Sequence, residues 1–79
     1  MKSNFLKLSL SSMEEKWPSA IVAREEIRNF TGGAISEKYL ANLDSQMKGP
    51  EGRFKIGRKV VYPVESVLRW LEGRIGDES

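Results

Sequence analysis

Apolar and polar residues alternate near the start of the chain, in residues 5–10. Leucine occupies every second position there, and Lys7 and Ser9 fall between the leucines. A period of two is typical of a half-buried β-strand, although an ordered tail explains the pattern as well. Residues 11–16 are expected to form a polar connection. Residues 1–16 are therefore interpreted as an N-terminal extension, either a strand or a tail.

A helical period follows Trp17, whose aromatic side chain is expected to cover the core. Residues 21–30 carry apolar side chains at every third or fourth position. This spacing predicts a helix of about two turns. Gly32 and Gly33 should end it, because glycine tolerates the left-handed conformation that is common just after a helix.

A second helix is predicted over residues 37–46, with Ser36 as its N-cap, because a serine side chain can accept a hydrogen bond from the first turn. Two short helices joined by a glycine-containing turn are typical of a helix-turn-helix. The buried stripe of this second helix is expected to contain Leu40, Leu43 and Met47, with Tyr39 beside it.

A β-hairpin is predicted over residues 53–62, and two registers compete for it. A two-residue loop would pair Ile56 with Lys59 and place a charge among apolar side chains. A three-residue loop over residues 57–59 would pair Ile56 with Val60, and Phe54 with Tyr62, so that all four share one apolar face. A slip of one residue turns every side chain to the other face. Burial therefore favours the three-residue loop.

The last element predicted is an amphipathic helix with Pro63 in its first turn, a position that suits proline. Either Gly73 or Gly76 is expected to end it, and residues 77–79 are expected to fray. The order helix, turn, helix, hairpin, helix predicts an α+β fold, a small winged helix-turn-helix over residues 17–76. The apolar stripe of the last helix contains Val64, Val67, Leu68, Leu71 and Ile75.

Composition narrows the range of functions. The chain has 79 residues, no cysteine and no histidine, which predicts one small domain without disulfides or thiolate metal sites. The commonest general base is also missing. We therefore expect no catalytic residues, no metal, no cofactor and no enzymatic activity. The longest apolar runs are too short to cross a bilayer, so a cytoplasmic protein without a membrane partner is expected.

Positive charge is concentrated in residues 48–59. This block contains five basic residues and one acid, so its local excess of four charges exceeds the net +2 of the whole chain. Such a patch on a small domain is typical of a surface that binds a polyanion. Phosphate contact is the favoured role for its four hairpin cations, and a solubilising loop is the alternative. These cations are Arg53, Lys55, Arg58 and Lys59.

The predicted second helix offers a face for reading DNA bases. Lys38, Asn42 and Ser45 lie opposite its apolar stripe. Lysine and asparagine can both recognise base edges in the major groove, although a solvated helix face explains the same pattern. Arg24 and Arg28 are weaker candidates, because the neighbouring glutamates can neutralise them.

Three sequence segments resemble a known family. They are Ala-Arg-Glu-Glu-Ile at residues 23–27, Ile-Ser-Glu-Lys-Tyr-Leu at 35–40, and Lys-Ile-Gly-Arg-Lys-Val-Val-Tyr-Pro-Val-Glu-Ser-Val-Leu-Arg-Trp-Leu at 55–71. Residues 21–70 are similar to the small phage and prophage excisionases, and to the related AlpA and MerR-type winged-helix modules that bind DNA.

The resemblance implies that a recognition helix over residues 36–45, Ser36 included, enters the major groove. It also implies a wing, over residues 53–59, on the neighbouring DNA backbone. Excisionases are recombination directionality factors: they bind repeated sites in prophage attachment DNA, bend it and favour excision by an integrase. A tyrosine or serine recombinase is thus an expected second partner. We expect a monomer in solution and several copies on nucleoid DNA. An AlpA-like prophage transcriptional regulator and a protein-interaction or anti-repressor module remain alternatives.

Overall fold

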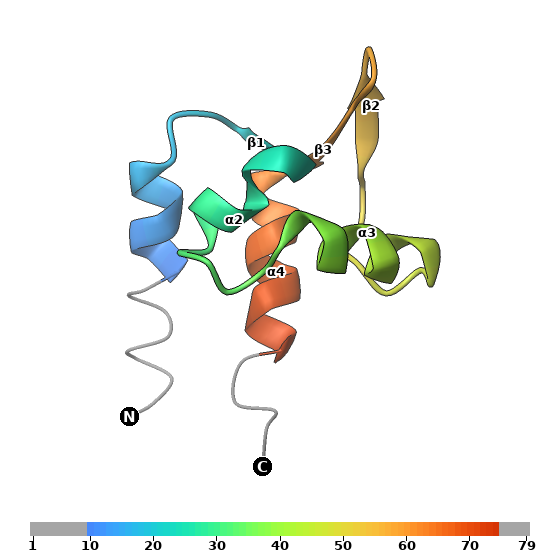
Figure 1. Cartoon of the computed structure of the whole chain (residues 1–79). Helices are drawn as coiled ribbons and strands as arrows, with labels where there is room; N and C mark the ends of the chain where they lie inside the picture. Colours follow the sequence, from blue (N-terminus) through green and yellow to red (C-terminus); the bar gives the residue numbers. More distant parts are fainter. Residues whose placement is uncertain (1–9, 75–79) are drawn as a thin grey trace.

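A computed structural model describes residues 10–74 of the chain, and these residues adopt a small α+β fold. Its strands are β1 (Ile21–Ala23), β2 (Phe54–Ile56) and β3 (Lys59–Pro63), and its helices are η1 (Arg24–Glu26), α2 (Ile27–Phe30), α3 (Glu37–Ser45) and α4 (Val64–Arg74). The strands form an antiparallel sheet in the order β1-β3-β2. Figure 1 shows the helices around the base of the sheet, with the β2–β3 hairpin standing out beyond them.

The chain before β1 differs from the prediction. Residues 10–16 are helical, where residues 11–16 were expected to form a polar connection. The physical reason is the spacing of Met13 and Trp17, which are four positions apart and both pack against the core cluster. Trp17 N also donates a hydrogen bond to Met13 O at 3.2 Å, as in a helical turn. Apart from Leu10, which is helical, the predicted strand or tail lies outside the described residues.

The helix predicted over residues 21–30 is wrong in its first part. Residues 21–23 form β1, in which Val22 pairs with Tyr62 of β3, and the helical turns begin only at Arg24. Branched residues such as Ile21 and Val22 favour strands, and the partner strand that satisfies their backbone groups comes from much later in the chain. The sequence of residues 21–30 alone gives no information about this partner strand, so it could not predict β1.

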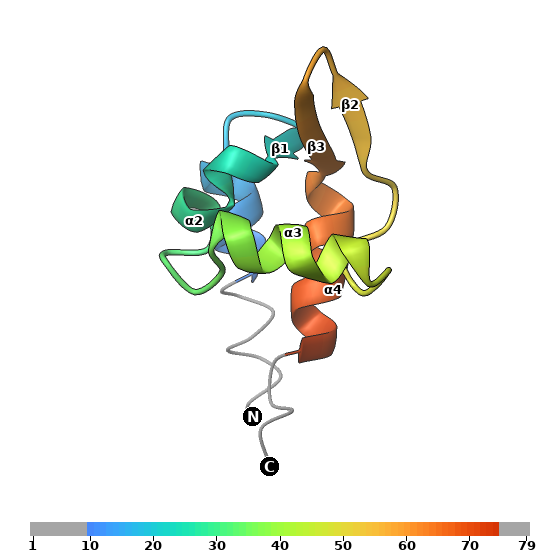
Figure 2. The same cartoon turned by 45° about the vertical axis from the view of Figure 1, so that its right-hand side comes forward.

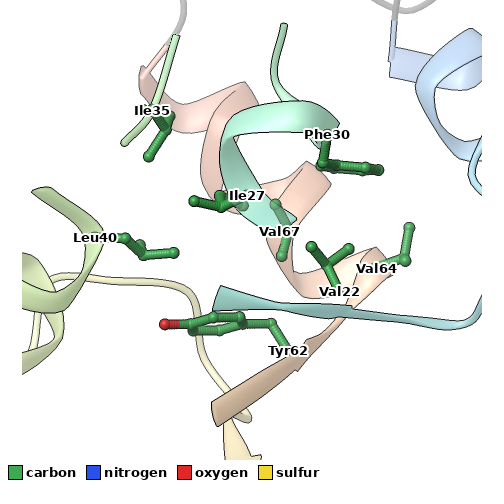
Figure 3. Packing of buried hydrophobic residues seen from close by; sticks show 8 residues of the cluster. All are labelled: Val22, Ile27, Phe30, Ile35, Leu40, Tyr62, Val64 and Val67. Atoms are coloured by element: carbon green, nitrogen blue, oxygen red, sulfur yellow. The ribbon is translucent and has the colours of Figure 1, made fainter. Parts of the chain in front are cut away.

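The core lies between the inner face of the sheet and the helices. Tyr62 and Val22 are fully buried there, and the edge of the Trp17 ring meets the Phe30 ring with the ring centroids 5.1 Å apart. Trp17 therefore covers the core, as predicted. Figure 3 shows the eight residues of this cluster, which are Val22, Ile27, Phe30, Ile35, Leu40, Tyr62, Val64 and Val67.

The turn between α2 and α3 is held as the sequence predicts. Gly32 and Gly33 have positive φ angles of 65° and 92°, which glycine adopts without steric penalty. The Thr31 hydroxyl donates to Ile27 O at 2.8 Å and accepts from Ile35 N at 3.0 Å. Ser36 Oγ accepts from Tyr39 N at 3.1 Å, which confirms Ser36 as the N-cap of α3.

The apolar stripe predicted for α3 is wrong at its last residue, Met47. Leu40 and Leu43 are buried, but Met47 is 82% exposed and has a φ of 61°. Met47 N donates to Asp44 O, and Lys48 N donates to Leu43 O, which is the Schellman pattern of a helix end. The chain turns back there, so Met47 leaves the helical stripe.

The hairpin adopts the two-residue loop, so the predicted register is wrong. Ile56 pairs with Lys59, and Phe54 pairs with Val61. Gly57 has a φ of 63° at the first loop position, which is where a type II′ turn places glycine. Burial does not select the register here, because the hairpin projects from the body and leaves Phe54 and Ile56 exposed.

The final helix confirms its predicted face, but it starts one residue later than predicted, because Pro63 is the last residue of β3 and pairs with Ile21. It begins at Val64, directly after Pro63, and buries Val64 and Val67 against the core. Gly73 is still helical, so the helix does not end there, and Gly76 lies outside the described residues. Across residues 10–74, no helix has both the length and the apolar character that a membrane span requires.

Candidate nucleic-acid interface

The exposed side of α3 and the β2–β3 hairpin lie next to each other. Figure 2 shows α3 crossing the front of the molecule, with the hairpin rising above it. Asp44 at the end of α3 connects the two elements, because it contacts Arg53 at the base of the hairpin and Tyr62 on β3. The eight residues predicted for the recognition helix and the wing lie on these two elements or next to them, whereas the weaker candidates Arg24 and Arg28 lie on η1 and α2.

On α3, two of the four predicted residues have exposed side chains that form no hydrogen bond with the part of the chain that the structure describes. Ser36 is used as the helix cap, and Ser45 Oγ donates to Asn42 O at 2.7 Å. Lys38 and Asn42 are exposed, and within residues 10–74 their side chains make no hydrogen bond. The two residues are one helical turn apart, so a base edge or phosphate could meet both.

The four hairpin cations divide into two pairs. Lys55 and Arg58 are exposed and form no ion pair with any residue that the structure describes. Lys59 Nζ lies 2.5 Å from Glu25 Oε1, and this hydrogen bond and its charge raise the pKa of Lys59. Arg53 Nη1 lies 3.8 Å from Asp44 Oδ1. The fold thus brings the carboxylates of Glu25 and Asp44 to the basic segment 48–59, which itself contains one acid, Glu51.

Asp44 is the residue that sequence reasoning missed. It is 3% exposed, and its Oδ2 accepts from Arg24 Nη2 at 2.7 Å and from the Tyr62 hydroxyl. Arg24 Nε donates to the same hydroxyl at 3.0 Å. Arg24 was expected to be neutralised by neighbouring glutamates, but it turns inward to α3 and β3 instead.

This cluster changes the acidity of its members. Burial, and then the hydrogen bond to Asp44, raise the pKa of Tyr62 to about 12. Burial alone would lower the pKa of Arg24, but its hydrogen bonds to Tyr62 and Asp44 outweigh burial and leave the pKa raised. Both groups therefore keep their protons at neutral pH. The cluster links η1, α3 and β3 directly beneath the candidate interface.

The second carboxylate oxygen of Asp44 lies against the backbone of the following turn. A Cβ atom added at Gly49 would lie 2.0 Å from Asp44 Oδ1, so this oxygen occupies the space of a side chain. Oδ1 is buried and accepts no hydrogen bond from the described residues. Its nearest cation is Arg53, at the base of the hairpin. The sequence held one signal for this site, since Asp44 lies four positions after buried Leu40 and so falls on the buried face.

Three aromatic side chains near the candidate interface or the core make contacts within the protein. Tyr62 is buried in the core, and Trp17 Nε1 donates to Ile21 O at 2.8 Å. Trp70 Nε1 donates to Lys48 O at 2.9 Å, while the Arg74 guanidinium lies 4.9 Å from the Trp70 ring centroid. The contacts of Trp70 join α4 to the end of α3.

Comparisons of the chain with models of protein families, with curated proteins and with solved structures found no match. Within the part of the chain that the structure describes, no group of three or more acidic residues is placed to hold a metal ion. The exposed surface of α3 and the hairpin combines the cations Lys38, Lys55 and Arg58 with the amide side chain of Asn42.

Proposed function

We propose that the protein is an excisionase-like DNA-binding protein that positions and bends DNA. Its fold would be a small winged helix-turn-helix, with α3 as the recognition helix and the β2–β3 hairpin as the wing. The observation that carries the proposal is a pair of exposed cations, Lys55 and Arg58, which form no ion pair with the residues that the structure describes. They lie on a projecting hairpin beside the exposed Lys38 and Asn42 of α3.

Each element has a physical role in this proposal. The major groove of DNA admits an α-helix, and Asn42 can pair with adenine while Lys38 reaches guanine. The wing cations would bind phosphates, which fixes the register of the protein on the duplex. Prophage attachment DNA, bound by several copies and acted on by an integrase, is the proposed setting in the cytoplasm. An AlpA-like transcriptional regulator would use the same interface and is the second candidate.

The test is binding to a generic duplex by fluorescence anisotropy, between roughly 50 and 200 mM salt. Four to five phosphate contacts predict a log–log slope of about −4. A Lys55→Ala/Arg58→Ala double variant should bind more weakly and lose about 2 from the magnitude of that slope.

A matched control removes two cations elsewhere. Lys16→Ala/Arg69→Ala changes the same net charge on the segment 10–16 and on α4, away from the hairpin. It should keep the slope of the original protein. No binding at the low-salt end would refute the proposal. Equal effects of the two double variants would remove the hairpin from it, and a partner protein bound with weak salt dependence would favour the interaction module.

A further inference from the structure

Two large apolar side chains are left uncovered on the hairpin. Phe54 is 46% exposed and Ile56 is 54% exposed. They are two positions apart on β2, so they point to the same face of the strand. Val61, which pairs with Phe54 on that face, is buried. The apolar face is thus covered near the body and becomes open toward the tip of the hairpin.

The surroundings of this pair indicate the charge of its partner. Arg53 and Lys55 alternate with the two apolar residues along the chain, and Arg58 follows at the turn. Lys59 lies directly across from Ile56. An apolar pair framed by cations fits a polyanion that also has an apolar interior. A DNA duplex has both, because its phosphates surround a stack of bases.

We propose that Phe54 and Ile56 form a wedge that inserts between base pairs from the minor groove and kinks the duplex. This inference rests on the proposed DNA-binding function and assigns the bending to two residues. Ile56 precedes Gly57 at the loop, so it would enter first, with Phe54 behind it. The cations beside them would hold the phosphates on both edges of the groove. Side chains of this kind bend DNA by roughly 20–90° toward the major groove.

The experiment uses a duplex selected from a random pool by rounds of binding to the full chain. Dyes on the two ends report bending by energy transfer, and 2-aminopurine at successive positions reports unstacking. The bound protein should shorten the end-to-end distance and brighten 2-aminopurine at one step. Pyrimidine–purine steps are the expected position, because they unstack most easily.

The decisive variant is Phe54→Ser/Ile56→Ser, which keeps every cation. It should bind the same duplex within about tenfold, because lost contacts and avoided unstacking offset each other. It should not bend the duplex or brighten 2-aminopurine. Met47→Ser is the matched control, since it removes another exposed apolar side chain at the end of α3, and it should bend DNA as the original chain does.

Three results would overturn the wedge. The first is a bound original chain that brightens no 2-aminopurine, a measurement that needs no variant to fold. The second is a double variant that bends DNA fully; either result leaves the proposed DNA binding intact. The third is self-association without DNA that the double variant abolishes, which would assign the pair to a contact between copies along the β2 edge. Failure to select any duplex would instead refute the proposed function, and the wedge with it.

Discussion

Asp44 on α3 accepts a hydrogen bond from the hydroxyl of Tyr62 on β3, and this buried contact fastens the candidate recognition helix to the central strand of the sheet. Arg24 donates to both partners. β3 is also the second strand of the hairpin, so the angle between α3 and the hairpin depends on the buried carboxylate of Asp44. The buried contacts of Asp44 therefore fix the relative position of α3 and the hairpin, the two elements of the proposed DNA-binding surface.

Removing this carboxylate should destabilise the domain strongly. Asp44→Ala would leave the Arg24 guanidinium and the Tyr62 hydroxyl without their common acceptor, and breaking a buried pair in this way typically costs about 3 kcal/mol or more. That is a large share of the roughly 4–12 kcal/mol expected for a domain of this length. Urea unfolding followed by circular dichroism measures the loss. Ser45→Ala on the exposed side of the same helix should change little, and a similar small effect at Asp44 would contradict this account.

A methyl group at position 49 should disturb the same contact from the other side. Gly49→Ala would place its Cβ 2.0 Å from Asp44 Oδ1, so the carboxylate would have to move away from its partners. We expect a loss of about 1–3 kcal/mol in the free energy of unfolding, typical of overpacking. Gly73→Ala is the control, because nothing lies within 4 Å of its Cβ and alanine favours the helix by up to about 1 kcal/mol.

The losses of unfolding free energy caused by Asp44→Ala and Gly49→Ala should not be additive. In the Asp44→Ala background the oxygen that the new methyl would meet is gone, so Gly49→Ala should add little further loss. Residues in direct contact commonly show such coupling. Additive losses in the double variant would mean that Gly49 is required for its own backbone and not for the carboxylate.

Features that depend on a few neighbouring residues could be predicted from the sequence. The Ser36 cap and the turn at Gly32 and Gly33 were confirmed, and the start of α4 was predicted to within one residue at Pro63. Each follows from a local rule, because a cap, a left-handed glycine and a fixed proline φ act within one turn of chain. The α+β composition followed from the order of these elements.

Features that depend on distant partners could not be predicted in this way. The Lys59–Glu25 ion pair joins residues 34 positions apart, and β1 exists only because β3 lies beside it. The hairpin register was predicted from burial, but the hairpin projects from the body, so the positive φ of Gly57 selects the loop. Asp44 shows both sides of this limit. Its helical spacing placed it on the buried face of α3, but a charged residue is rarely fully buried, so the sequence did not predict its burial.

The raised pKa of Tyr62 predicts a loss of stability at alkaline pH. The hydroxyl titrates near 12 in the folded chain, against an ordinary value of 10.0. Its contribution is fully present below pH 10 and is lost as pH rises through 12, because the unfolded chain gives up the proton first. Unfolding curves between pH 9 and 12 should show this loss, and Tyr62→Phe should flatten it. A direct check is the absorbance of tyrosinate, since the chain has only two tyrosines: the step near 12 should disappear in Tyr62→Phe.

Glu25 is expected to restrain DNA binding by holding a wing cation. Its carboxylate pairs with Lys59 Nζ in the absence of DNA, so Glu25→Gln should free Lys59 for a phosphate and raise the affinity. Each added phosphate contact steepens the log–log salt slope by about 1. Glu72→Gln on α4 makes the same change in net charge far from the hairpin, and should raise affinity less and leave the slope as it was. Adding Lys59→Ala to Glu25→Gln should cancel the steeper slope. If the slope stays steep in that double variant, then the gain came from removing a repulsive carboxylate and not from releasing Lys59.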